Sequence, residues 1–177
     1  MAAGQGYALA QYNLGLIYYS DYGVSRESQE AAKWFLLAAQ QGYAIAIGYS
    51  AGNTEQGKSA IAIGYNAGRS NQGTNAVAIG IQAGYSNQLS GAIAMGYFAG
   101  QTNQGSKAVA LGFQAGYYNT TGSNNVFVGA YTGAGTTFTG SYCVAIGREA
   151  LYNNAGSDDQ TAVGYRAMYQ MRGYQNV

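Results

Sequence analysis

The sequence predicts a mainly β protein, a parallel β-solenoid of about eight short coils preceded by a helical hairpin. A phrase of the type Ala-Ile-Ala-Ile-Gly recurs eight times after residue 43, at spacings of 16 to 18 residues. Charged residues make up only 8% of the chain, against about 25% in ordinary globular domains. The chain also has 28 glycines and no proline. Self-similarity at a fixed period is typical of repeat architectures, in which each repeat forms one structural unit.

The first 43 residues predict two helices. Leucine and tyrosine recur at helical spacing from Ala8 to Tyr19, as expected for a helix with one apolar face. The helical pattern then ends at residues 21–23, and Ser25 is suited to cap a second helix from about residue 26 to 40. We expect Trp34 to lie in the core between the two helices.

The remaining residues, 44–177, predict a separate repeat domain. Seven of the eight phrases are each followed by a short segment containing alanine, and then by a polar turn. Residues 176–177 have the composition of the start of a ninth phrase, so we expect the domain to be truncated within a ninth coil.

Alternation within each phrase gives every strand two apolar faces. In the second phrase it places Ile61 and Ile63 on one face and Ala60 and Ala62 on the other. Strands that are apolar on both faces are normally buried on both, yet a thin solenoid has only one interior. We therefore expect another copy of the chain to cover the second face. The residues predicted to form the structural core are Ile61, Ile63, Val77, Ile79, Ile93 and Val109, together with Trp34.

A glycine ends every phrase, which predicts a backbone bend or a positive φ that a side chain would block. The eight structural glycines are Gly48, Gly64, Gly80, Gly96, Gly112, Gly129, Gly147 and Gly164.

The polar turns repeat asparagine and glutamine at equal positions. Stacking of equal coils predicts amide ladders, in which each side chain hydrogen-bonds the next. The expected ladders contain Gln56, Gln72, Gln88 and Gln104, and Asn71, Asn87, Asn103 and Asn119.

Composition argues against several classes of function. Eight Lys and Arg are scattered among seven Asp and Glu, without the basic cluster that nucleic-acid binding requires, so no nucleic-acid partner is predicted. No apolar run is long enough for membrane insertion. The chain has no histidine, the commonest general base, so we expect no enzyme and no catalytic residues.

Two further groups of residues were candidates for chemistry. The adjacent Asp158 and Asp159 lie in a turn rich in glycine and asparagine, where we expect solvated carboxylates and neither a metal nor a cofactor. Cys143 replaces the first alanine of a phrase, and we expect a small buried hydrophobic side chain rather than a nucleophile.

Tyrosine is the residue type that points most directly to binding. The chain has 18 tyrosines, and Tyr85, Tyr117 and Tyr118 lie beside the polar turns. These rings could form a stacked column that covers the solenoid. Alternatively, they could form a flat aromatic and amide surface for a glycan or a partner protein, and on that interpretation the three are the candidate binding residues.

The phrases resemble a known repeat family. They read AIAIG at 44–48 and 60–64, AVAIG at 76–80, AIAMG at 92–96 and AVALG at 108–112. These motifs are similar to the head repeats of trimeric autotransporter adhesins and to related repeats in viral and phage tail-fibre proteins. The resemblance implies a left-handed parallel β-roll that assembles as a homotrimer. The units here are longer than those typical of adhesin heads.

The N-terminal segment resembles a Sel-one-like repeat, a relative of the tetratricopeptide repeat. The match rests on Leu14-Gly15, Tyr18, Trp34, Ala38-Ala39 and Gln41-Gly42-Tyr43, whereas Asp21 stands where the family usually has glycine. The resemblance implies an αα-hairpin with a role in protein interaction.

Together these features predict an extracellular segment of a structural or adhesive fibre at a cell or virion surface. It would present a rigid surface to a receptor, either a glycan or a host-surface protein. One alternative is a subunit of a self-assembling extracellular filament of identical chains, and another is an intracellular scaffold built on the helical repeat. An ice- or mineral-binding solenoid would need regularly spaced threonines, and threonine is irregular here.

Overall fold

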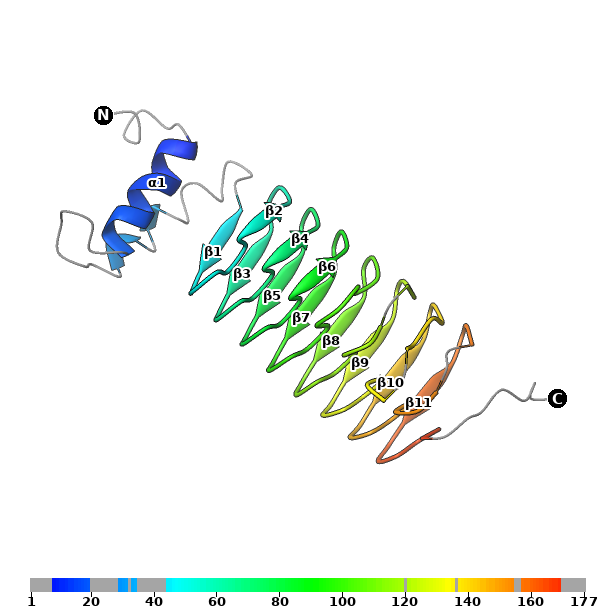
Figure 1. Ribbon diagram of the computed structural model, residues 1–177. Coiled ribbons are helices and arrows are strands. Elements are labelled where there is room, and N and C mark those ends of the chain that lie inside the picture. The colour runs from blue at the N-terminus through cyan, green and yellow to red at the C-terminus, as the bar shows by residue number, and fades with distance from the viewer. Residues whose placement is uncertain are drawn as a thin grey trace. The chain divides into compact units, whose positions relative to one another are not determined.

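The computed structural model describes residues 8–19, 29–31, 33–34, 44–119, 121–135, 137–154 and 157–169 (Figure 1). The chain divides into two compact units, Met1–Ile45 and Ala46–Val177. Each unit is described separately below.

The N-terminal unit contains the helix α1, Ala8–Tyr19, which confirms the first predicted helix. Residues 29–31 and 33–34 are also helical, whereas the rest of the second predicted helix lies outside the described residues. Ala31 is buried and Trp34 is half-buried. An indole is too large for full burial to be common. Because much of the second predicted helix lies outside the described residues, the placement of Trp34 between the two helices stays a prediction. No helix in the described part of the chain is long and apolar enough to cross a membrane.

The second unit is a parallel β-solenoid, as predicted (Figure 1). Its main sheet has eight three-residue strands, one per coil. The chain makes seven full turns between the first of these strands and the last. They are β1 (Ile45–Ile47), β3 (Ile61–Ile63), β5 (Val77–Ile79), β7 (Ile93–Met95), β8 (Val109–Leu111), β9 (Val126–Val128), β10 (Val144–Ile146) and β11 (Thr161–Val163). A smaller parallel sheet contains β2 (Thr54–Gln56), β4 (Ser70–Gln72) and β6 (Ser86–Gln88).

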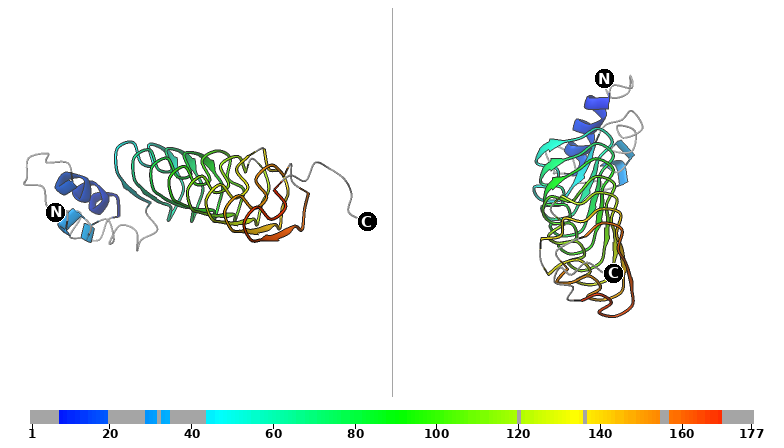
Figure 2. Two further views of the ribbon diagram at one scale, coloured as in Figure 1. Left: turned by 90° about the horizontal axis from the view of Figure 1, so that it is seen from below. Right: turned by 90° about the vertical axis from the view of Figure 1, so that its right-hand side faces the viewer.

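The coils stack in the register that the repeat requires, so equivalent residues form columns (Figure 2). Between β3 and β5, Ile61 pairs with Val77, Ala62 with Ala78 and Ile63 with Ile79. Backbone hydrogen bonds between coils continue outside the strands. Each coil is therefore joined to the next by backbone hydrogen bonds both inside and outside the strands.

Alanine fills the interior of the solenoid. The central alanine of each of the strands β3, β5, β7 and β8 is fully buried, and so are the alanines that follow the phrase glycines in the same coils. A Cβ added at Gly84 would lie 3.2 Å from the Cβ of Ala78, so the two walls of a coil are close together. Apart from the buried glutamines described below, only small side chains fit between them in these coils. In the later, longer coils Phe127 and Phe138 occupy the interior, with ring centroids 5.3 Å apart.

The bulky strand residues lie on the outer face of the main sheet, which corrects their assignment to the core of the chain. The reason is the narrow coil, which leaves no room inside for a branched side chain. These half-buried residues are Ile61, Ile63, Val77, Ile79, Ile93 and Val109.

The phrase glycines share one backbone conformation, with φ between 124° and 133° at all eight positions. At seven of these positions, all except Gly164, the next coil also passes very close. A Cβ at Gly80 would lie 2.6 Å from the carbonyl oxygen of Gly96. Both the torsion angle and the close approach therefore require glycine.

The glutamine ladder is present as predicted, inside the solenoid. The Nε2 atoms of Gln56, Gln72 and Gln88 each donate to the Oε1 atom of the glutamine one coil further on, at 3.1 Å. Gln72, Gln88 and Gln104 are buried.

The asparagine ladder is shorter than predicted. Asn71 donates to Asn87, and Asn87 to Asn103, both at 2.8 Å. Asn119 is instead fully buried, and its Oδ1 accepts a hydrogen bond from Asn125 at 3.4 Å. The coils lengthen at this point in the sequence, which shifts the turn out of register.

Candidate functional site

One surface feature is a series of aromatic rings in contact across successive coils. The repeat brings these rings together because residues one period apart lie in neighbouring coils. We call this group of eight rings the aromatic array. Its members are Tyr97, Phe98, Phe113, Tyr117, Tyr118, Tyr131, Tyr152 and Tyr169.

One line of the array runs across the coils. Tyr97 stacks on Phe113 with ring centroids 5.2 Å apart and planes within 6°. Phe113 meets the edge of Tyr131 at 5.1 Å, and Tyr131 approaches Tyr152 at 6.4 Å. Tyr152 and Tyr169 are again parallel, 5.3 Å apart and within 8°. Such contacts stabilise the rings in fixed orientations.

A second line branches from Tyr97 and contains two of the predicted binding residues. Tyr97 contacts Phe98 edge-on at 4.2 Å, and Phe98 approaches Tyr117 at 6.0 Å. Tyr117 and Tyr118 are nearly perpendicular, 4.4 Å apart. Burial, together with the neighbouring Tyr118, raises the pKa of Tyr117 above its ordinary value. Tyr118 remains 44% exposed.

The third predicted binding residue, Tyr85, lies apart from the other two. Its hydroxyl oxygen accepts a hydrogen bond from Arg69 Nη1 at 2.5 Å, and the same guanidinium group lies 5.5 Å from its ring centroid. The backbone N–H of Ser86 donates to the carbonyl oxygen of Gln101 in the next coil. The side chain of Gln101 in turn forms a hydrogen bond with Tyr117, so Gln101 lies between Tyr85 and Tyr117. Tyr85 is thus on the same edge of the solenoid but outside the aromatic array.

A charged cluster lies beside the last rings of the array. Arg148 Nε donates to Glu149 Oε1 at 3.1 Å, and Arg166 Nε donates to Oε2 at 2.7 Å. The carboxylate side chain is only 10% exposed, whereas the two arginines are 64% and 51% exposed. The hydrogen bond from Arg166, reinforced by the charges of both arginines, lowers the pKa of Glu149.

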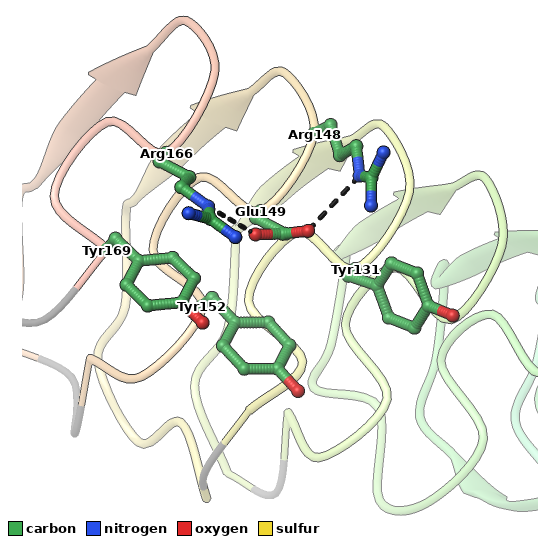
Figure 3. Close-up of a pocket in the computed structure, with 6 residues that line it drawn as sticks. All are labelled: Tyr131, Arg148, Glu149, Tyr152, Arg166 and Tyr169. Atoms are coloured by element: carbon green, nitrogen blue, oxygen red, sulfur yellow. Dashed lines mark hydrogen bonds and ion pairs between the residues drawn. The ribbon is translucent and has the colours of Figure 1, made fainter.

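These charged groups and three rings line an open pocket of about 330 Å³, shown in Figure 3. The lining residues are Tyr131, Arg148, Glu149, Tyr152, Arg166 and Tyr169. We call this hollow the tyrosine–arginine pocket.

The pocket was not predicted from the sequence, although a signal for it exists. Glu149 and Arg166 each stand two residues after a phrase glycine, and Tyr152 and Tyr169 each stand five residues after one. Equal positions in adjacent coils are neighbours, so the two charges and the two rings had to meet. Only a comparison of repeat positions rather than of sequence neighbours reveals this.

The outer face of the main sheet is a second large surface. It presents two columns of branched or long apolar side chains, from the first and the third residue of each strand, with one threonine at Thr161. No strand of this sheet contains a charged residue. The most exposed of these apolar side chains are Met95 at 42%, Ile146 at 42% and Val163 at 65%. We call this surface the outer sheet face.

The other residues that the sequence singled out for chemistry are Cys143 and the adjacent Asp158 and Asp159. Cys143 is fully buried, and burial raises the pKa of its thiol group, which disfavours the reactive thiolate. Asp158 Oδ1 accepts a hydrogen bond from the backbone of Ser141 at 2.8 Å. No cluster of three or more potential metal ligands occurs within the described ranges.

No protein-family model, curated protein or solved structure matches this chain. The aromatic array, the tyrosine–arginine pocket and the outer sheet face are therefore the features from which a function can be inferred.

Proposed function

We propose that the chain is a segment of a structural and adhesive fibre at a cell or virion surface. In this proposal the segment presents a rigid surface to a glycan or a protein of the host. The observation that carries the proposal is the aromatic array, eight rings in mutual contact on the outside of a solenoid. Aromatic side chains supply a large contact area with few rotatable bonds, which is why binding surfaces are enriched in them.

The solenoid supports this role because it holds the array still. Neighbouring coils are joined by strand pairing in register and by the buried glutamine ladder. A surface that is already ordered loses little conformational entropy on binding. The number of coils sets the reach of the fibre.

We also propose that the outer sheet face packs against copies of the same chain in a homotrimer. The face is uncharged and largely apolar along eight strands, and its side chains are half-buried or exposed in a single chain. A second copy has the same spacing between coils, so its columns can match this face along its whole length. A partner without that period would match only a few coils.

Light scattering of the purified protein tests the homotrimer. We expect a mass of three chains of 18.4 kDa each. Ile79→Lys should reduce the mass to one chain, because burying an unpaired ammonium group in an apolar interface is strongly unfavourable. The matched control is Leu89→Lys, since Leu89 is 46% exposed but directly follows β6, outside the outer sheet face.

Other masses would contradict the trimer. A mass that grows with concentration would instead indicate a filament of identical chains. A single-chain mass at every concentration would show that the outer sheet face does not pair copies.

Binding of the labelled protein to a glycan array and to cell surfaces tests the adhesive role. We expect Tyr117→Ala to weaken binding at least about tenfold, the effect of losing a central aromatic contact. Tyr142→Ala is the control, because Tyr142 is 62% exposed and lies outside the array. Binding that survives both Tyr117→Ala and Tyr85→Ala would remove the proposed surface.

A further inference from the structure

The tyrosine–arginine pocket combines an aromatic platform with a fixed pair of cations. We propose that it binds an acidic saccharide, in which a sugar ring carries a carboxylate group. This inference rests on the proposed adhesive function and assigns a ligand class to one end of the aromatic array.

The platform is formed by two tyrosines from adjacent coils. The rings of Tyr152 and Tyr169 are parallel within 8°, with centroids 5.3 Å apart. The two rings are stacked with an offset, and Figure 3 shows them next to the charged cluster. Such a surface is suited to the apolar C–H face of a sugar ring, because the electron-rich face of an aromatic ring attracts polarised C–H groups.

The cations are oriented by the carboxylate between them. Arg148 and Arg166 each use Nε to donate to Glu149. An arginine has five N–H donors, and the hydrogen bond to Glu149 uses one of them, Nε, in each arginine. The arginine side chains are more than half exposed, and the lining residues carry two positive charges and one negative charge. This donor set fits a carboxylate, which guanidinium groups bind through paired hydrogen bonds.

Glu149 acts as a positioning residue in this arrangement. Its side chain is 10% exposed and bonded on both oxygens, so it holds the guanidinium groups rather than contacting the ligand. Arg166 is also held by two rings, with its guanidinium carbon 5.1 Å from the ring centroid of Tyr165 and 5.0 Å from that of Tyr169, so the ring of Tyr152 is the part of the platform that the guanidinium group leaves open. The donors and the platform are thus in place before a ligand arrives, which lowers the entropy lost on binding.

A second arginine–tyrosine pair provides an internal control. Arg69 also lies over a ring, that of Tyr85, but it uses a terminal nitrogen, Nη1, to bond the tyrosine hydroxyl. It therefore lacks a second guanidinium group beside it, and it uses a terminal nitrogen where the pocket arginines use Nε. An acidic sugar should not distinguish Arg69→Gln from the unchanged protein.

Calorimetric titration of the full chain with tri-galacturonic acid, at physiological salt, tests the proposal. Its methyl ester is the matched neutral probe. We expect the ester to bind the unchanged protein at least about tenfold more weakly than the acid does. We expect the same loss when the acid binds Arg166→Gln or Arg148→Gln, because a charge-assisted hydrogen bond is lost in each case. Tyr152→Leu should weaken acid and ester alike, since it removes stacking but no charge. Arg69→Gln should leave both affinities unchanged.

Three results would overturn the proposal. The first is equal affinity for the acid and the ester. The second is inorganic sulfate displacing the sugar with no effect of Tyr152→Leu, which would indicate a simple anion site. The third is undiminished acid binding in both arginine variants, each checked for an unchanged melting curve.

The adhesive function can fail or stand separately from the pocket. Cell binding that depends on Tyr117 but not on Arg148 or Arg166 would retain the adhesive function and reject the pocket as its saccharide site. Acid binding at the pocket, with cell binding that does not depend on Tyr117, would retain the pocket as an acidic-saccharide site and reject the adhesive role of the aromatic array.

Discussion

Replacing Gly80 with alanine is expected to destabilise the solenoid by about 2–6 kcal/mol. One part of this loss is backbone strain, because φ at Gly80 is 125°, in a region that residues with a Cβ rarely adopt. The other part is steric, since the new Cβ would lie 2.6 Å from a backbone oxygen of the next coil. Neither coil can move aside without breaking the strand pairing on both sides. Denaturant unfolding followed by circular dichroism measures the loss.

A matched glycine separates the two contributions. Gly164 has nearly the same φ, 124°, but nothing lies within 4 Å of its Cβ position among the described residues. Gly164→Ala should therefore show the strain alone, about 1–3 kcal/mol. Gly147 lies one coil earlier, also with φ 124°, and its Cβ would meet the oxygen of Gly164 at 2.5 Å. If Gly147→Ala were as mild as Gly164→Ala, coil proximity would not be the reason for glycine at this position.

Gln88→Leu is expected to destabilise the solenoid by about 2–5 kcal/mol, although it keeps the side chain close in size. Gln88 Nε2 donates to the carbonyl oxygen of Val77 at 2.8 Å and to Gln104 Oε1 at 3.1 Å. Its own Oε1 accepts from Gln72 at 3.1 Å. Leucine would leave these partners without Gln88 in a region from which water is excluded, and a buried group without a partner is destabilising.

The neighbouring asparagine ladder supplies the control for Gln88. Asn87 makes equivalent hydrogen bonds along the stack at 2.8 Å, but on the outside. Asn87→Gly keeps the positive φ of 54° without strain, and water can replace the lost amide. We expect a loss of about 1 kcal/mol or less, measured by the same unfolding curves. Equal losses at residues 87 and 88 would show that burial of the ladder has no energetic importance.

The sequence predicted the columns of the solenoid well because the repeat length is nearly constant. A residue and its equivalent 16 positions later must lie in adjacent coils. The glutamine ladder and the burial of Cys143 follow from this rule and are confirmed. Where the repeat lengthens to 17 and 18 residues the rule weakens, and Asn119 leaves its predicted column.

The aromatic array could be predicted only in part. Contacts within a column, such as that of Tyr97 with Phe113, follow from the register. Contacts between columns, such as that of Phe98 with Tyr117, depend on how sharply the backbone turns after the phrase glycine. The spacing of residues along the chain does not contain that curvature.

The sequence alone therefore determined that the chain stacks in parallel coils and which residues share a column, because periodicity is a property of the sequence. Only the tertiary structure decided which strand face is inside. Alternation distinguishes an isoleucine face from an alanine face, and both are apolar. The distance between the two walls of a coil selects alanine for the interior, and it places Ile61, Val77 and their equivalents on the outer sheet face.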